Sequence, residues 1–324
     1  MIFSMNRSKI FLLLAVICLS CNQKNNEQHS RSTQQPVKTM ATTIPSFDGT
    51  SAYSFLTAQT NFGPRNPSSI GHHECLNYLT KELENYADTV RLQHFTRQGY
   101  NETLRLTNII ASFKPETASR ILLLAHWDTR PRAEQDPDAA KRNKPIIGAN
   151  DGASGVAVLL ELARILKNNP PPIGIDILLT DGEDYGFADQ DGNDDMYFLG
   201  ARYFAKTKPA GYNPRFGILL DMIGDADLQI PMEQFSMKYA PQIVDQIWNV
   251  ADEIGIPQFV RVPGEAVSDD HIPLNEAGIP TIDLIDFQYP HWHTTHDTPD
   301  KCSPQSLEAV GKVLTTFIFT KLQE

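Results

Sequence analysis

The sequence predicts an α/β protein of three layers, in which helices cover both faces of a central, twisted, mixed but mostly parallel sheet. Apolar runs of strand length alternate along the chain with amphipathic helical patterns, which is the element order of such a sheet. Several of the apolar runs end in a carboxylate. Because parallel strands end together at one edge of the sheet, polar functional groups are expected along that edge.

Each element is expected from its own pattern. In the first helix Cys75, Leu79 and Leu83 recur at helical spacing, and the clearest helical pattern has a broad apolar face that stops before Pro170. The strands are apolar runs, several of them rich in β-branched residues. The alternation includes one further helix between the third and fourth strands. In chain order the bounded elements are helix 68–86, strands 106–113 and 120–128, helix 153–167, strands 175–180 and 217–221, helix 241–254, strand 281–287 and helix 306–322.

The composition is that of a globular protein. The chain has 324 residues, of which 41% are hydrophobic and 21% charged, and this is enough for one large α/β domain. No internal repeat is present, so one catalytic domain is expected at 46–324. The formal net charge of −11 argues against holding nucleic acid by bulk electrostatics. We expect a monomer that does not bind nucleic acid.

The first 45 residues are expected to lie outside the fold. Residues 1–20 join a short basic region to an apolar stretch too short to span a membrane, which is typical of a signal peptide. The stretch ends before Cys21 and resembles a bacterial lipobox, with Cys21 as the lipidated first residue; an ordinary secreted protein cleaved nearby is the alternative. Residues 21–45, rich in Gln, Asn, Ser and Thr, are interpreted as a flexible tether. A periplasmic protein, attached to a bacterial membrane by its lipid anchor only, is therefore expected.

Two cysteines, Cys75 and Cys302, remain in the domain. They could pair in an oxidising periplasm or stay as two free, buried thiols, and both alternatives are open. The domain has no Cys-x-x-Cys pair, so a zinc site built on cysteine is not expected there.

The best candidates for zinc ligands are Asp151, Asp184 and His293, because a catalytic zinc takes three His, Asp or Glu ligands and keeps one position open. Asp151 directly precedes a helix, where capping is the ordinary role of Asp. Glu183 and Asp184 repel each other, which suggests that one binds metal and the other handles protons; a solvated acidic loop is the alternative. Trp292 beside His293 would form an apolar wall for a small substrate or pack in the core.

Further polar residues end two other strands. In a two-metal site His126, Asp128 and Asp221 would hold the second ion, with Asp151 as the bridge. In a one-metal site Asp128 would support the ligands from behind and Asp221 would be a free carboxylate. The acidic run 189–195 offers oxygens to Ca²⁺ but lacks the full pattern of a calcium loop, so calcium is the weaker interpretation there.

Six segments in register carry a family resemblance: HWDTR, GANDGASGVAVLLELAR, DGED, LLDMIGD, DDHIPL and PHWHTTHDT. They resemble the zinc aminopeptidase (M28-like) superfamily and, within it, the glutaminyl-peptide cyclotransferases of the animal type and their bacterial homologues. The resemblance covers nearly the whole domain. The roles that it implies are one zinc on Asp151, Asp184 and His293, a proton shuttle at Glu183, further active-site carboxylates at Asp221 and Asp269, and a substrate-side tryptophan at Trp292.

The resemblance also implies a reaction. One Zn²⁺ per chain would serve to convert the N-terminal glutamine of peptides or proteins to pyroglutamate, with release of ammonia. A two-zinc aminopeptidase on the same fold is the alternative, and a non-enzymatic lipoprotein that binds peptide or metal is a third. Asp184 stands where the animal enzymes have Glu, and the tryptophan of their following loop is missing, so a different substrate entrance is expected.

Overall fold

The central feature of the fold is a six-stranded sheet. The computed structural model describes residues 44–187 and 195–322, and Thr42–Glu324 form one compact unit. The strands of the sheet are β1 Thr89–Gln98, β2 Thr103–Phe113, β3 Arg120–His126, β4 Gly174–Thr180, β5 Gly217–Asp221 and β8 Thr281–Ile285. Their spatial order is β1-β2-β4-β3-β5-β8; β4, β3, β5 and β8 run parallel, whereas β1 and β2 pair antiparallel. Two short strands, β6 Ile230–Met232 and β7 Phe259–Pro263, form a separate parallel pair.

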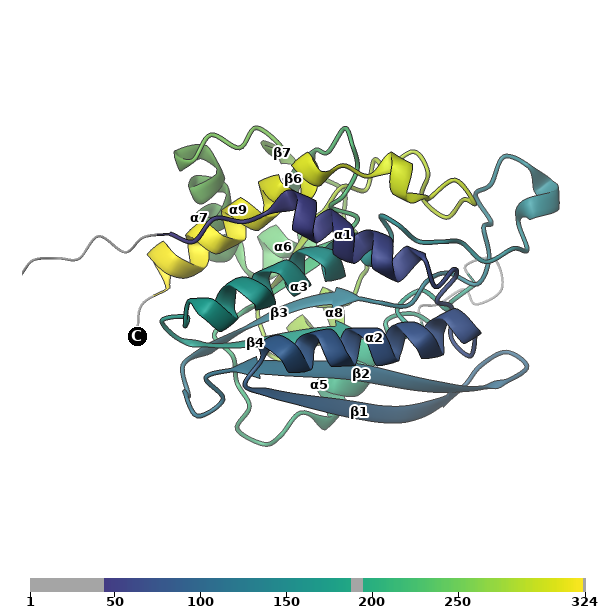
Figure 1. Cartoon of the computed structure of the whole chain (residues 1–324), viewed down its shortest axis with the longest axis horizontal. Coiled ribbons are helices and arrows are strands. Elements are labelled where there is room, and N and C mark those ends of the chain that lie inside the picture. Colours follow the sequence, from purple (N-terminus) through teal and green to yellow (C-terminus); the bar gives the residue numbers. More distant parts are fainter. Residues whose placement is uncertain (1–43, 188–194, 323–324) are drawn as a thin grey trace, which may run out of the picture. The chain divides into compact units, whose positions relative to one another are not determined.

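Helices cover both faces of this sheet (Figure 1). One face carries α1 Gly49–Thr60, α2 Ile70–Tyr86, α3 Ala153–Asn168, α7 Pro241–Glu253 and α9 Pro304–Lys321. The other carries α5 Leu199–Thr207 and α8 His271–Glu276, and α6 Gln234–Tyr239 contacts β8 at the edge of the sheet. Two short 3-10 helices, η1 Ala139–Lys141 and η2 Pro299–Lys301, lie in loops.

The strands are buried on both sides, which explains their continuous apolar runs. In β3, Ile121 and Leu123 belong to the larger core under α1, α2, α3, α7 and α9. Leu122 and Leu124 belong to the smaller core, which includes Phe204 of α5 and Leu274 of α8. Successive side chains of a strand point to opposite faces, so both layers must supply apolar partners.

The predicted fold class is confirmed, and every bounded element is present to within a few residues. The helix expected between the third and fourth strands is α5. Several elements were not predicted: α1, β1, β6, α6, β7 and α8. The strand β1 escaped notice because it lies at the edge of the sheet and its side chains are mostly exposed, so its sequence has no apolar run.

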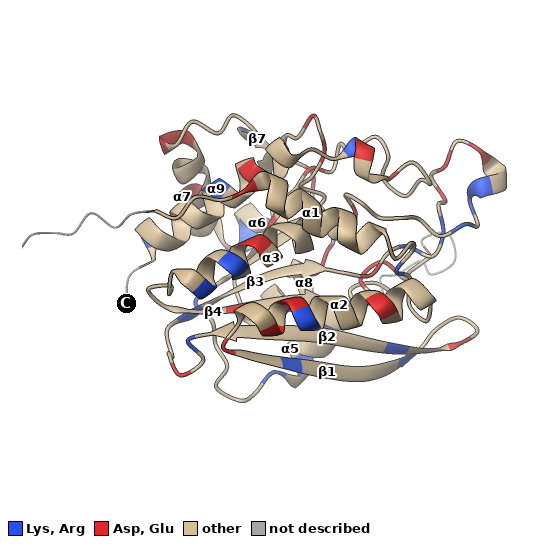
Figure 2. Cartoon of the chain, in the orientation of Figure 1, with Lys and Arg blue, Asp and Glu red and all other residues tan. Residues whose placement is uncertain are grey.

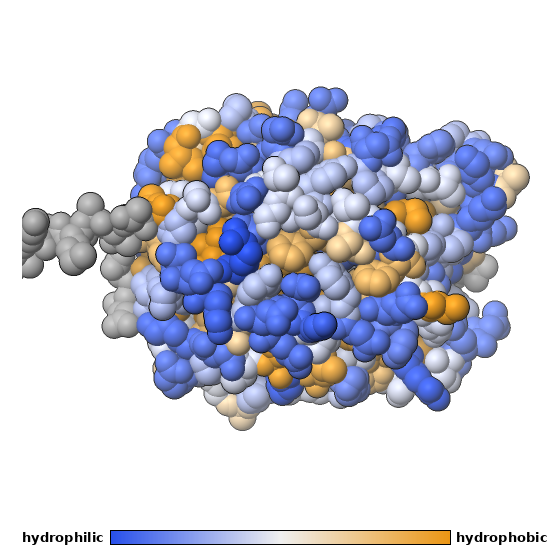
Figure 3. Space-filling model, viewed as in Figure 1, coloured by the Kyte–Doolittle hydropathy of each residue, from blue (hydrophilic) through white to orange (hydrophobic). Residues whose placement is uncertain are grey.

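The two domain cysteines, Cys75 and Cys302, are free and buried, so the thiol alternative is correct. No helix in the described part of the chain is long and apolar enough to cross a membrane. Figure 3 shows small, scattered apolar groups on one face, and Figure 2 shows basic residues mixed with acidic ones along the elements. The signal peptide, Cys21 and nearly all of the tether lie outside the described residues, as do 189–194 of the candidate calcium run.

Candidate metal and catalytic site

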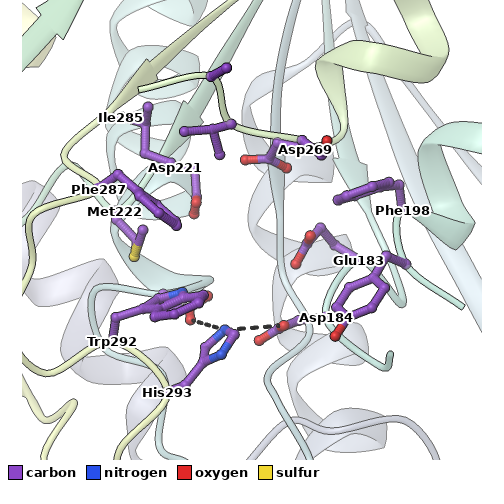
Figure 4. A pocket seen from close by; sticks show the side chains of 15 residues that line it. Glu183, Asp184, Phe198, Asp221, Met222, Asp269, Ile285, Phe287, Trp292 and His293 are labelled. Atoms are coloured by element: carbon purple, nitrogen blue, oxygen red, sulfur yellow. Dashed lines mark ion pairs between the residues drawn. The ribbon is translucent and has the colours of Figure 1, made fainter. Parts of the chain in front are cut away.

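The predicted site residues converge at the carboxyl edge of the parallel strands. His126 ends β3, Asp221 ends β5, and Glu183 and Asp184 follow β4. His293 comes from the loop after β8. Figure 4 shows Glu183 and Asp184 on one side of a pocket, Asp221 and Trp292 on the other, and His293 between the two sides. The edge prediction was therefore right about where these residues meet.

Three of the residues, Asp151, Asp184 and His293, form a group with the dimensions of a zinc site. His293 Nε2 lies 3.4 Å from Asp184 Oδ1 and 3.6 Å from Asp151 Oδ2. Two ligand atoms on one tetrahedral zinc, with bonds of about 2.0–2.2 Å, lie roughly 3.3–3.6 Å apart. In addition, Asp151 Oδ2 and Asp184 Oδ2 are buried without a hydrogen-bond partner among the described residues. Orphaned carboxylate oxygens are costly, so this donor set fits a bound cation.

A second group, His126, Asp151 and Asp221, has similar spacing. His126 Nε2 lies 3.1 Å from Asp221 Oδ1 and 3.3 Å from Asp151 Oδ1. Here, however, the facing atoms satisfy each other, because His126 Nε2 and Asp221 Oδ1 are hydrogen-bonded. Burial opposes protonation of His126, but the surrounding carboxylates of Asp128, Asp151 and Asp221 raise its pKa well above the usual range. A protonated ring balances part of their negative charge.

Asp151 owes its position to its surroundings rather than to helix capping. The N-cap of α3 is Gly152, at φ 102°, and no side chain caps the helix. A Cβ at Gly152 would lie 2.4 Å from the carbonyl oxygen of Asp128, so only glycine fits this turn. The carboxylate of Asp297 accepts the backbone N–H groups of Asn150 and Asp151, at 2.8 and 3.1 Å. The capping interpretation of Asp151 was wrong, and the role of Asp297 was not foreseen.

A buried arginine, Arg130, supports two of the candidate ligands and was not predicted from the sequence. Arg130 Nη1 donates to Asp184 Oδ1 at 2.5 Å, and the same guanidinium pairs with Glu134. Glu134 in turn lies 3.5 Å from His293 Nδ1. Burial alone would raise the pKa of Asp184, but Arg130 and His293 hold it below the usual range. The chain Asp184–Arg130–Glu134–His293 thus fixes two ligands from behind.

Glu183 is placed as a buried base beside the candidate ligands. Asp128 accepts the backbone N–H groups of Glu183 and Asp184, at 3.1 and 3.4 Å, and so fixes the turn after β4. Burial and the adjacent Asp184 charge raise the pKa of Glu183 well above its usual range. Such a carboxylate binds a proton more tightly than an exposed one, and it faces the pocket.

Asp269 also faces the pocket, from the loop before α8. Burial and the nearby Asp221 raise the pKa of Asp269 well above its usual range. Asp269 accepts the N–H of Asp270, and Asp221 pairs with His126.

The pocket has a volume of about 360 Å³, within the range of small-molecule sites. Trp292 stacks on the ring of His293, with centroids 3.7 Å apart, and is only half-buried. It therefore forms a wall of the pocket rather than part of the core. Phe198, Ile285 and Phe287 complete the apolar walls (Figure 4). In the sequence, Phe198 lies near the place where the family's loop tryptophan is missing.

The chain is similar to known proteins in sequence and in structure. The model of peptidase family M28 matches residues 108–318. A glutaminyl cyclase of Bacteroides thetaiotaomicron bound to N-acetylhistamine is 40% identical, with a TM-score of 0.83 over 86% of this chain and 99% of that one. A leucine aminopeptidase precursor of the same organism is 41% identical, also at 0.83, over 86% and 98%. The mouse glutaminyl-peptide cyclotransferase-like protein is 26% identical over 78% of this chain and 71% of its own length.

The family match spans well over half of the chain, and the solved relatives are covered almost completely. These findings confirm the resemblance drawn from the six segments. The chain belongs to peptidase family M28, among the members that include the bacterial glutaminyl cyclases.

Proposed function

We propose that this protein is a zinc-dependent glutaminyl-peptide cyclotransferase, which converts an N-terminal glutamine to pyroglutamate and releases ammonia. One observation carries the proposal. The buried base Glu183 and the orphaned oxygens of Asp151 and Asp184 face a single small pocket with aromatic walls. The similarity to solved glutaminyl cyclases supports the substrate.

A zinc ion on Asp151, Asp184 and His293 would act as a Lewis acid on the carbonyl of the glutamine side chain. The neutral α-amine attacks the carbonyl carbon, so that a new C–N bond closes the five-membered ring and the bond to the amide nitrogen breaks. Glu183 accepts the proton that the α-amine loses and delivers it to the departing nitrogen. Its raised pKa suits this task, because a carboxylate in the pocket must be a strong enough base to take a proton from an amine.

The other pocket residues position the substrate and exclude water. Trp292 and Phe287 offer apolar surface to the side chain of the substrate and limit access of water, whose attack would give deamidation. Asp269 lines the same pocket, and its raised pKa favours the protonated form, which donates a hydrogen bond. Because the reaction is intramolecular, holding amine and carbonyl together supplies much of the rate enhancement.

One zinc per chain is part of the proposal. The hydrogen bond from His126 to Asp221 supports it, since these atoms need no second ion. Metal analysis of the purified protein should find about one zinc per chain. Two tightly bound zinc ions would instead favour the aminopeptidase alternative, to which the same fold and the His126, Asp151 and Asp221 group are suited.

The reaction itself can be tested directly with a peptide that begins with glutamine. The proposal predicts loss of the mass of ammonia from an otherwise intact chain, whereas release of free glutamine would refute it. Glu183→Gln should lower kcat by at least about 100-fold, the usual contribution of a general base, and leave zinc bound. Glu183→Asp is the matched control, because it keeps the base and should retain more activity. Full activity in Glu183→Gln would disprove the proton shuttle.

Location and assembly are also proposed. The protein acts in the periplasm as a monomer, attached by lipid on Cys21, and its substrates are exported proteins with an N-terminal glutamine. The support is the lipobox-like segment before Cys21. Labelling with a radioactive fatty acid should mark the wild-type protein and not Cys21→Ser; equal labelling of both would contradict the anchor.

A further inference from the structure

A second hollow, of about 770 Å³, adjoins the catalytic pocket. Phe287 lines both (Figure 4 shows its pocket side). Three loop segments also run from one hollow to the other. The segment after β5 lines the pocket at Asp221 and the hollow from Asp225, the segment after β7 lines the hollow up to Glu265 and the pocket from Ala266, and the segment after β8 contributes to both. The hollow is therefore an extension of the active-site rim.

The hollow has an apolar floor. Val260, Val262 and three prolines, Pro231, Pro263 and Pro290, line it. Val262 is 53% exposed, which is unusual for a large aliphatic side chain in this protein. Proline lacks an N–H group, so the three prolines offer apolar contact without backbone donors. Such a surface suits the aliphatic parts of an extended peptide.

The rim of the hollow is acidic and largely unneutralised. Asp225, Asp227, Glu265 and Asp300 line it, and the one cationic side chain there, Lys301, pairs with Asp300 at 2.7 Å. Glu265 accepts a hydrogen bond from the neutral amide of Gln288, at 2.6 Å. Within residues 44–187 and 195–322, Asp225, Asp227 and Glu265 have no ion-pair partner. The rim is thus complementary to a positively charged ligand.

We propose that this hollow binds the residues that follow the N-terminal glutamine of the substrate, and that it favours substrates with Lys or Arg there. The inference rests on the proposed function: only the first residue enters the catalytic pocket, so the remaining chain must leave across its rim. The stems of Lys or Arg can cover the apolar floor while their charged ends face Asp227 and Glu265. The hollow then acts on specificity and takes no part in the chemistry.

The test compares three peptides that begin with glutamine and differ only in Lys, Ser or Glu at positions 3–6, together with glutaminyl amide, which has no following chain. With the full-length protein, kcat/KM should be higher for the Lys peptide than for the Glu peptide by about three- to tenfold, mainly through KM. This is the range expected from two partly exposed ion pairs. In Asp227→Asn/Glu265→Gln the ratio should fall towards one, whereas glutaminyl amide should be unaffected. The matched control is Glu74→Gln/Glu84→Gln, two exposed acids of α2 on a different face.

Other outcomes refute the inference without ambiguity. Cyclisation of all peptides at equal rates would leave the proposed function intact and disprove the hollow as a subsite. An undiminished Lys preference in the double variant would do the same. A uniform rise in kcat/KM for every peptide in that variant would also disprove the subsite, because the rim would then not discriminate between the residues that follow glutamine. If no substrate is cyclised, the proposed function fails; fluorescence anisotropy of the labelled Lys and Glu peptides then still measures whether the acidic rim discriminates between them.

Discussion

Replacing Arg130 by Met should damage both the stability of the protein and its zinc site. The guanidinium is 1% exposed, and its two partners Asp184 and Glu134 are themselves largely buried. It also donates to the hydroxyl of Tyr197, at 3.0 Å. Methionine has a similar length but offers no charge and no donor. The substitution therefore leaves two carboxylates without their cation at the back of the metal site.

The expected loss of stability follows from the burial of Arg130 and its partners. Breaking a buried pair by removing one partner costs about 3–5 kcal/mol, because the remaining charge is left without compensation. Loss of a residue that orients a metal ligand typically weakens metal affinity by about 10–100-fold. Arg261 is the control, since its pair with Asp252, at 2.7 Å, is exposed on both sides, 39% and 56%. For Arg261→Met a loss of only about 0.2–1 kcal/mol is expected, with zinc affinity unchanged.

Two measurements on the metal-free protein test this reasoning. Urea unfolding gives the free energy of each variant, and titration with zinc against a chelator gives the dissociation constant. Arg130→Met/Glu134→Gln should recover part of the lost stability, because it removes one of the two stranded charges. If Arg130→Met unfolds at the same urea concentration as the wild type and binds zinc equally well, the support of Asp184 from behind is refuted.

Two further substitutions test a glycine turn beside the site and a buried carboxylate at the start of α6. Gly152→Ala should lower the free energy of unfolding by at least about 2–3 kcal/mol and weaken zinc binding, since the new Cβ would lie 2.4 Å from a backbone oxygen. Gly278→Ala is the control: its φ is 83°, but its Cβ would meet open space, so a loss of only about 1–2 kcal/mol is expected. Equal losses in the two variants would contradict the steric argument. Burial opposes ionisation of Glu233, but His271 and backbone N–H groups lower its pKa to about 2, from 4.5. A depressed pKa stabilises the fold above about pH 4.5, and the gain, at most about 3 kcal/mol, is lost as the pH falls towards 2. Unfolding free energies of Glu233→Gln and the wild type should therefore converge over that range, and parallel curves would refute the assignment.

The sequence allowed prediction of those parts of the site that depend on the sheet. Asp221 and the Glu183–Asp184 pair follow apolar runs that could only be buried strands, and parallel strands end at a common edge. Periodicity alone therefore places these carboxylates near one another. Periodicity could not assign a separate role to each carboxylate, and those roles were inferred from the resemblance of six segments to a known family.

The supporting residues could not be predicted in this way. Arg130 and Glu134 lie in a loop rich in charged residues and proline, where nothing distinguishes a buried pair from solvated side chains. Asp184, the partner of Arg130, is 54 positions away, so the contact exists only in the folded chain. The supporting role of Asp297 could have been predicted, because this residue lies four positions after His293 in one of the six segments. A carboxylate so close to a candidate ligand was a signal for a supporting role.

The difference between a cyclase and a peptidase on this fold can be traced to the two oxygens of Asp151. Oδ2 faces His293 and has no hydrogen-bond partner in the described chain, whereas Oδ1 faces His126 at 3.3 Å. A metal at the second position would need His126 without its Nε2 proton, whereas the hydrogen bond to Asp221 Oδ1 suits a ring that carries this proton. In the proposed one-zinc site, Asp151 would hold the zinc ion with one oxygen and face His126 with the other, and no second metal would be needed to activate a water molecule. With the nucleophile supplied by the substrate itself, a site with one metal and one base is sufficient for ring closure.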